Sequence, residues 1–86
     1  ENPEIMRPPM EIFVSLKLFA TLKKHMPESA DRFPIYSGAS VRDIVSLLGI
    51  PPEEVKLVFV DGQKQSLDTP LQGGERVGLF PPVGGG

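Results

Sequence analysis

The fold is decided by the stretch Ser40-Val41-Arg42-Asp43-Ile44-Val45-Ser46-Leu47-Leu48-Gly49-Ile50-Pro51-Pro52. Its apolar residues recur at i, i+3, i+4 and i+7, a spacing that predicts an amphipathic helix over residues 40–48 with one buried stripe: Val41, Ile44, Val45 and Leu48. Ser40 is a good N-cap, Gly49 suits the left-handed position after a helix, and the two prolines end it. Because this is the clearest helix in the chain, it must cover one face of a sheet formed by the other segments.

Strand patterns lie on both sides of this helix. Residues 11–19 alternate, with four aliphatic side chains on the side expected to face the core: Ile12, Val14, Leu16 and Leu18. Residues 32–37 predict a second short strand, and Pro34 assigns it to a sheet edge because proline donates no hydrogen bond to a ladder. Between them, residues 20–26 predict about two helical turns before Pro27, with Leu22 and Met26 at i and i+4.

Three more strands follow the helix. Residues 56–60 are apolar on both faces, which favours a strand that is central or covered twice. Asp61-Gly62 predicts a tight turn into a short strand over residues 63–67, and residues 76–80 form the last strand. This last strand is expected beside the first one in the sheet centre. The prediction is therefore an α+β fold of the ubiquitin-like β-grasp type, with a mixed four- to five-stranded sheet and one main helix on one face.

The 86 residues allow one small domain. We predict that it spans residues 10–80, with a flexible C-terminal tail over 81–86. Residues 1–9 contain three prolines and no periodic pattern, which is typical of a disordered leader, either a natural extension or an artificial remnant. Met10 is a candidate natural start.

Composition excludes several function classes. The chain has no Cys, so thiolate metal sites and Cys nucleophiles are excluded, and one His cannot build a multi-histidine metal site. We therefore expect no metal site. A net charge of −2 argues against nucleic acid as a partner, because phosphate binding needs clustered positive charge. No apolar run is long enough to cross a membrane and no export signal is present, so we expect no membrane partner and a cytoplasmic location.

The tail is the chemical feature of the chain. The last strand continues directly into Pro81-Pro82-Val83-Gly84-Gly85-Gly86. Two prolines favour an extended polyproline conformation, and six extended residues reach about 20 Å. Three glycines make the end thin and leave the terminal carboxylate without a neighbouring Cβ. Such an end can enter a narrow channel in another protein and bring its last carbonyl carbon to a foreign active site. A floppy terminus is the simpler interpretation of three glycines alone.

Several segments resemble a known family: Leu18-Phe19-Ala20-Thr21-Leu22-Lys23, Val58-Phe59-Val60-Asp61-Gly62, residues 67–77, and the ending Leu79-Phe80-Pro81-Pro82-Val83-Gly84-Gly85-Gly86. Over residues 10–86 the chain resembles the MoaD/ThiS family of ubiquitin-like sulfur carrier proteins. It is most similar to the MoaD branch, the small subunits of molybdopterin synthase. The resemblance implies a non-catalytic sulfur carrier that binds no cofactor itself.

What the resemblance implies chemically concerns Gly86. A ubiquitin-activating-type enzyme would use ATP to adenylate its carboxyl, and a sulfur donor would convert it to a thiocarboxylate. The tail, residues 81–85, would thread into the large subunit of molybdopterin synthase and deliver sulfur for the cofactor that holds molybdenum or tungsten. The absence of Cys agrees with this, because the terminus is then the one place to carry sulfur covalently.

Partner contacts are predicted near the base of the tail. Phe19 and Phe80 are expected on the sheet face away from the helix. Phe59 and Phe13 are further candidates for the same contact and rank below these two. The alternative is that these rings complete the core or pack on one another. Lys64 follows the hairpin at a position where the resemblance implies an apolar partner contact, which is a departure from the family pattern.

Three other functions stay open. The first is a ThiS-type carrier for thiamine thiazole synthesis, although its tails usually lack the two prolines. The second is a ubiquitin-like modifier that is joined through Gly86 to lysines of target proteins. The third is a plain β-grasp interaction domain with an inert tail.

Overall fold

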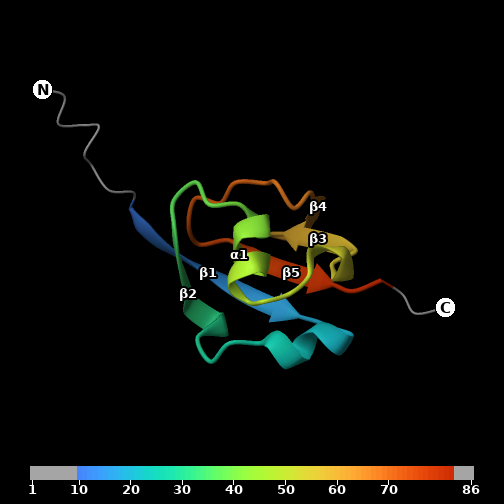
Figure 1. Cartoon of the computed structure of the whole chain (residues 1–86). Coiled ribbons are helices and arrows are strands. Elements are labelled where there is room, and N and C mark those ends of the chain that lie inside the picture. The colour runs from blue at the N-terminus through green and yellow to red at the C-terminus, as the bar shows by residue number, and fades with distance from the viewer. Residues whose placement is uncertain (1–9, 83–86) are drawn as a thin grey trace, which may run out of the picture.

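The computed structural model describes residues 10–82, so the leader 1–9 and the tail residues Val83, Gly84, Gly85 and Gly86 lie outside the described residues. Its single sheet has the strand order β2-β1-β5-β3-β4 (Figure 1). The strands are β1 (Glu11–Leu18), β2 (Phe33–Tyr36), β3 (Leu57–Val60), β4 (Gln63–Gln65) and β5 (Arg76–Phe80). β1 and β5 are parallel and the other neighbours are antiparallel. The first and last strands therefore pair in the sheet centre, as predicted.

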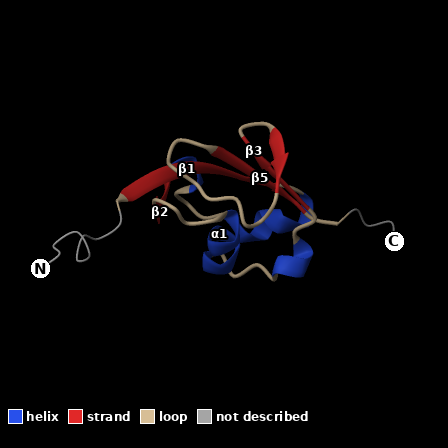
Figure 2. Ribbon diagram, turned by 90° about the horizontal axis from the view of Figure 1, so that it is seen from above, coloured by secondary structure: helices blue, strands red, loops and turns tan. Residues whose placement is uncertain are grey.

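The helical elements cover one face of this sheet. They are helix α1 (Val41–Leu47) and three short 3₁₀ helices: η2 (Ala20–His25), η3 (Ala30–Arg32) and η4 (Pro52–Glu54). Figure 2 shows α1 on one side of the strands, and no helix among the described residues lies over the opposite face of β3 and β5. A mixed sheet with one main helix on one face confirms the predicted ubiquitin-like β-grasp.

The core lies between α1 and the sheet. All four aliphatic side chains predicted to face inward from β1 are buried: Ile12, Val14, Leu16 and Leu18. They meet Val41, Ile44 and Val45 of α1, none of which has exposed surface, and Val77 and Leu79 of β5. Leu48 is only partly buried against this core. The alternation in β1 and β5 sends the remaining side chains of both strands to the uncovered face.

Both ends of α1 are fixed locally. The Ser40 hydroxyl accepts from the Asp43 N–H at 3.3 Å, and the Asp43 carboxylate accepts from the Ser40 N–H at 2.9 Å, which together form a capping box. At the other end Gly49 has φ of +76°, and the Ile50 N–H donates to the Val45 carbonyl at 3.1 Å. The left-handed turn at Gly49 is as predicted, and Ile50, which follows it, is buried.

Two predicted elements differ from the structure. Within residues 20–26, Ala20–His25 form a six-residue 3₁₀ helix, and Met26 is 44 % exposed rather than packed beside buried Leu22. With three residues per turn, side chains at i and i+4 no longer align, so the predicted pair is wrong. The strand over 63–67 ends at Gln65, because the Leu67 carbonyl accepts from the Arg42 N–H at 2.7 Å and holds the chain against the start of α1. β2 with Pro34 is an edge strand, as predicted.

Candidate functional site

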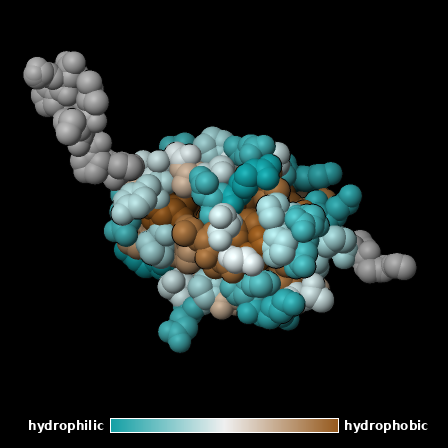
Figure 3. All heavy atoms as spheres, in the orientation of Figure 1, coloured by the Kyte–Doolittle hydropathy of each residue, from teal (hydrophilic) through white to brown (hydrophobic). Residues whose placement is uncertain are grey.

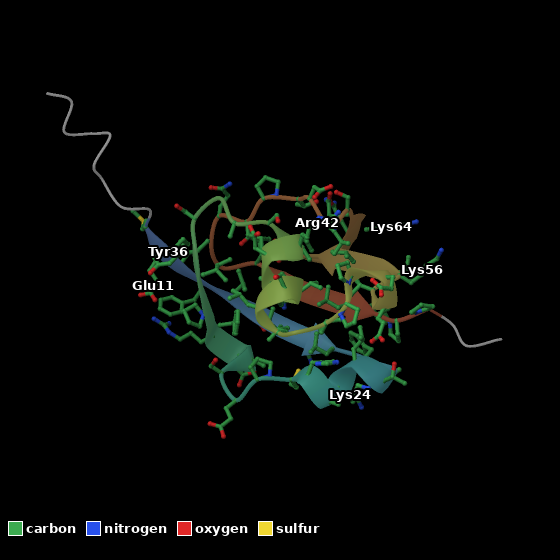
Figure 4. All side chains as sticks on the ribbon, in the orientation of Figure 1. Glu11, Lys24, Tyr36, Arg42, Lys56 and Lys64 are labelled. Atoms are coloured by element: carbon green, nitrogen blue, oxygen red, sulfur yellow. The ribbon has the colours of Figure 1, made fainter. Side chains whose placement is uncertain are left out.

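The tail leaves the domain from the end of the central strand. Leu79 has no exposed surface, and the carbonyl of Phe80 accepts from the Lys56 N–H at 2.8 Å. Pro81 is half-buried and Pro82 is exposed. The chain is therefore held by the sheet up to Phe80 and departs within two residues. Figure 4 shows Lys56 at this same end of the molecule.

Three phenylalanines form a cluster around that point, on the sheet face away from α1. The rings of Phe19 and Phe80 are stacked, with centroids 4.2 Å apart and planes within 5° of parallel. Phe59 meets Phe80 edge-on at 5.6 Å and 75°. All three are only partly buried. We call these residues the aromatic cluster; it unites three of the four predicted partner-binding residues.

The cluster borders a hollow of about 420 Å³ whose floor is Gly78. In the sheet register Gly78 lies between Lys17 of β1 and Phe59 of β3. A Cβ atom at Gly78 would lie 3.6 Å from the Phe19 ring and 3.9 Å from the Phe80 ring, so a glycine here leaves space between the aromatic side chains. The missing side chain is therefore what opens the hollow.

The rim of the hollow is charged. Lys17, Asp61 and Arg76 line it beside the aromatic rings. Asp61 is held in place because its carboxylate accepts from the Arg76 N–H at 3.0 Å and its own N–H donates to the Arg76 carbonyl at 2.8 Å. An apolar floor inside a polar rim is the usual anatomy of a protein-docking surface.

Lys64 lies on the same sheet face. It stands directly opposite Phe59 in the β3–β4 register, and directly opposite residues share a face. It is exposed and adds a second lysine, after Lys17, to this side of the sheet. The structure thus brings all four predicted partner-binding residues to one face. Phe13 is separate, because it lies near the start of β1 with the Arg32 guanidinium 4.0 Å above its ring.

The hollow offers binding groups rather than a catalytic constellation. Its lining contains no hydroxyl, thiol or imidazole side chain. Within residues 10–82, no three His, Asp or Glu side chains converge in a way that would hold a metal ion. No helix in the same range is long and apolar enough to span a membrane.

Sequence reasoning missed Gly78, Lys17 and Asp61 as parts of the site. The available signal was Gly78 itself, since glycine inside a strand often means that another chain or ring approaches the backbone closely. Asp61 was recognised only as a turn residue, and its φ of +52° confirms the turn. The predicted tail contacts of Val83, Gly84, Gly85 and Gly86 stay predictions, since these residues lie outside the described range.

Comparison with known proteins gives a family for the chain. The family model described as Mut7-C ubiquitin matches residues 9–84. A search of curated proteins found no match.

Solved structures give the same fold. The Haloferax volcanii HVO 2177 protein superposes with a TM-score of 0.71 at 22 % identity, over 93 % of this chain and 92 % of that one. A putative molybdopterin converting factor, subunit 1, from Pyrococcus furiosus gives 0.58 at 27 % identity, over 84 % and 99 %. SAMP1 from Haloferax volcanii gives 0.60 at 24 % identity, over 86 % and 99 %. At 22 % and 24 % identity the two Haloferax structures support the fold alone.

Proposed function

Because the chain belongs to the Mut7-C ubiquitin family, within the ubiquitin-like proteins of the MoaD/ThiS type, we propose that it is a sulfur carrier whose C-terminal Gly86 is the loaded group. The finer proposal is that it serves as the small subunit of molybdopterin synthase. Its partners are then a ubiquitin-activating-type adenylating enzyme and the synthase large subunit. The chain supplies the sulfur and the docking surface, and the partners supply the catalytic groups and the ATP site.

The observation that carries this proposal is the position of the tail root. The chain leaves the central strand at Phe80, which is itself a member of the aromatic cluster and borders the hollow over Gly78. A partner that covers the hollow therefore receives the tail at a fixed place. Pro81 and Pro82 then favour an extended exit, and a segment of six extended residues spans about 20 Å.

The proposed loading has two balanced steps. The Gly86 carboxylate attacks the α-phosphorus of ATP, forms an acyl-adenylate and releases pyrophosphate. A sulfide donor then adds to the carbonyl carbon, AMP leaves with the bonding electrons, and a thiocarboxylate remains. In delivery, the thiocarboxylate sulfur attacks an electrophilic carbon of the acceptor and displaces an oxygen leaving group, which departs with the bonding electrons. Water then cleaves the resulting thioester, which restores the Gly86 carboxylate and leaves a thiol on the acceptor.

Molybdopterin is favoured as the destination by two observations. The ending Pro81-Pro82-Val83 precedes the glycines, and the tails of ThiS-type carriers usually lack both prolines. The Pyrococcus furiosus structure, at 27 % identity, is named as a molybdopterin converting factor subunit. A modifier that is conjugated to target lysines would use the same adenylate, with an amine in place of sulfide.

The test is loading and transfer with purified partners. The chain is incubated with the activating enzyme of its host, ATP and a sulfide donor, and its intact mass is measured. We expect one terminal oxygen to be exchanged for sulfur, and the loaded protein to convert a cyclic pterin precursor when the large subunit is added. Conjugates of Gly86 to lysine would instead support a ubiquitin-like modifier, and transfer of sulfur to a thiazole acceptor would support a ThiS-type carrier. No loading at all would contradict the proposal and support an interaction domain with an inert tail.

Two matched variants separate the tail from the docking face. Removal of Gly85-Gly86 should abolish loading and leave the melting temperature unchanged, because the described domain holds the chain only up to Phe80. Gly78→Leu should fill the hollow and weaken binding of the large subunit by about tenfold or more, since the face can no longer seat a side chain. Lys24→Glu, an exposed change on η2, is the control and should leave binding within about twofold.

A further inference from the structure

A second surface lies at the opposite end of β1, between the edge strand β2 and helix α1. A groove of about 610 Å³ runs there, lined on the strand side by Ile35 and Tyr36 and on the helix side by Ala39 and Leu47. In Figure 3 hydrophobic surface is visible between α1 and β2, with hydrophilic side chains around it. This groove contains no residue of the hollow over Gly78.

Exposed hydrophobic side chains gather at this groove. Among residues 10–82, four large hydrophobic residues are exposed: Met10 at 70 %, Leu47 at 68 %, Tyr36 at 59 % and Met26 at 44 %. Leu47 and Tyr36 line the groove, and Met10 lies next to it because its carbonyl accepts from the Ser37 N–H at 2.8 Å. Three of the four therefore lie at one site, which is the distribution expected of an interaction surface.

The open edge of β2 offers one donor and one acceptor. Ser37 and Met10 form a hydrogen-bonded pair, so the alternation of an antiparallel ladder directs Ile35 and Phe33 toward β1 and directs Pro34 and Tyr36 outward. Pro34 has no N–H, and the Tyr36 carbonyl already accepts from Ala39 at 3.0 Å. What is left is the Pro34 carbonyl and the Tyr36 N–H.

These two groups can pair with an added strand in either orientation. In an antiparallel ladder the two residues that flank the one opposite Ile35 satisfy the Pro34 carbonyl and the Tyr36 N–H. In a parallel ladder the residue opposite Ile35 satisfies both, because it donates to the carbonyl of residue i−1 and accepts from the N–H of residue i+1 of its neighbour. In either orientation the side chain opposite Ile35 shares the face of Ile35, which is the helix-side face, and enters the groove toward Leu47.

The charge of the groove indicates which residues of a bound segment should flank the apolar side chain that enters the groove. Its two ionisable groups besides Tyr36 are the carboxylates of Glu11 and Asp43, and no Lys or Arg lines it. Figure 4 shows Glu11 beside Tyr36 at the start of β1. A bound segment with Lys or Arg within two residues of its apolar residue gains from these carboxylates, Asp43 on the helix-side face and Glu11 on the face of Tyr36, whereas an acidic segment is repelled.

We propose that the groove between β2 and α1 binds an extended, basic peptide segment of a partner protein, which adds to the edge of β2 and seats an apolar side chain between Ile35 and Leu47. This is β-strand addition with side-chain selection. It does not depend on the proposed sulfur chemistry, since neither the tail nor the aromatic cluster takes part.

The test uses labelled peptides and the whole chain. The probes are Arg-Lys-Val-Ile-Val and Val-Ile-Val-Lys-Arg, basic at one end or the other, and their counterparts with Glu in both basic positions. Amide resonances of Tyr36, Ala39 and Leu47 should shift with one of the basic probes, and its glutamate counterpart should bind at least about tenfold more weakly. N-methylation of the donor to the Pro34 carbonyl, which is the residue opposite Ile35 in a parallel complex or the residue after it in an antiparallel one, should cost about fivefold or more in affinity.

Variants complete the test. Leu47→Glu alters a side chain that is 68 % exposed, so it should fold and lose at least about tenfold in affinity. Met26→Glu changes an exposed hydrophobic residue outside the groove and should bind within about twofold. The proposal is overturned if neither basic probe binds at 1 mM (about the weakest range of specific recognition), if acidic probes bind as well, or if shifts map to the aromatic cluster.

Discussion

The stacking of Phe19 on Phe80 should be measurable as a coupling free energy in the free protein. The rings lie 4.2 Å apart and within 5° of parallel, so each ring contacts the other across its face. Aromatic pairs contribute about 0.5–1.5 kcal/mol beyond the area they bury, and for a partly exposed pair we expect about 1 kcal/mol. Phe80→Ala also loses the edge contact with Phe59. Its total cost should be about 2 kcal/mol, below the range for a fully buried ring.

The assay is a double-mutant cycle with Phe19→Ala, Phe80→Ala and the double variant, each unfolded in urea and followed by circular dichroism. For a domain of this size, 2 kcal/mol lowers the melting temperature by about 10 °C. Phe13→Ala with Phe80→Ala is the control pair and should be additive within about 0.5 kcal/mol, since Phe13 packs under Arg32 instead. A coupling free energy for Phe19 and Phe80 no larger than that of the control pair would refute a preformed aromatic cluster, and the two rings would then not define the sides of the hollow.

Three further changes test local features of the fold. Ala20 has φ of +53°, so Ala20→Gly should relieve strain and raise the unfolding free energy by up to about 1 kcal/mol in thermal melts; a loss would contradict the left-handed backbone there. The exposed Arg42 guanidinium hydrogen-bonds Asp68 at 2.9 Å and lowers the pKa of that carboxylate, so the pair stabilises the fold above about pH 4. The difference in unfolding free energy between the parent and Asp68→Asn should shrink as pH falls below that value and as salt rises. A difference that grows in acid would contradict stabilisation by the charged Asp68 carboxylate. Ser40→Ala removes the hydroxyl half of the capping box and should cost about 1 kcal/mol in urea unfolding, with no cost expected if Asp43 alone caps the helix.

The fold was predictable from the sequence because local and global signals agree in its central elements. The alternation of β1 and the stripe of α1 both describe buried faces, and Gly49 and Pro51 define where the helix stops. The predicted helical turns over residues 20–26 were wrong in type because they rested on the spacing of two residues. Leu22 and Met26 have helical spacing, but the left-handed residue Ala20 and the following 3₁₀ turn give that segment a different period.

The candidate site was predictable only in part, for a physical reason. The face occupied by Phe19, Phe59 and Phe80 follows from period-two alternation once β1, β3 and β5 are recognised. The hollow depends on Gly78, whose neighbours across β1 and β3 are set by the register of a parallel and an antiparallel ladder. Those registers join segments about 60 and 20 residues apart in the chain, and no local pattern fixes such a pairing.

The aromatic cluster and the groove between β2 and α1 lie at opposite ends of β1. Glu11 begins β1 at the groove, while Leu18 ends it beside Leu79 at the root of the tail. At about 3.3 Å per residue, the seven steps from Glu11 to Leu18 separate the groove from the tail root by about 23 Å. A partner of standard size that covers the aromatic cluster and receives the tail therefore need not cover the groove. If both surfaces bind, one partner held at the β2 edge and another at the aromatic cluster can occupy the chain at the same time.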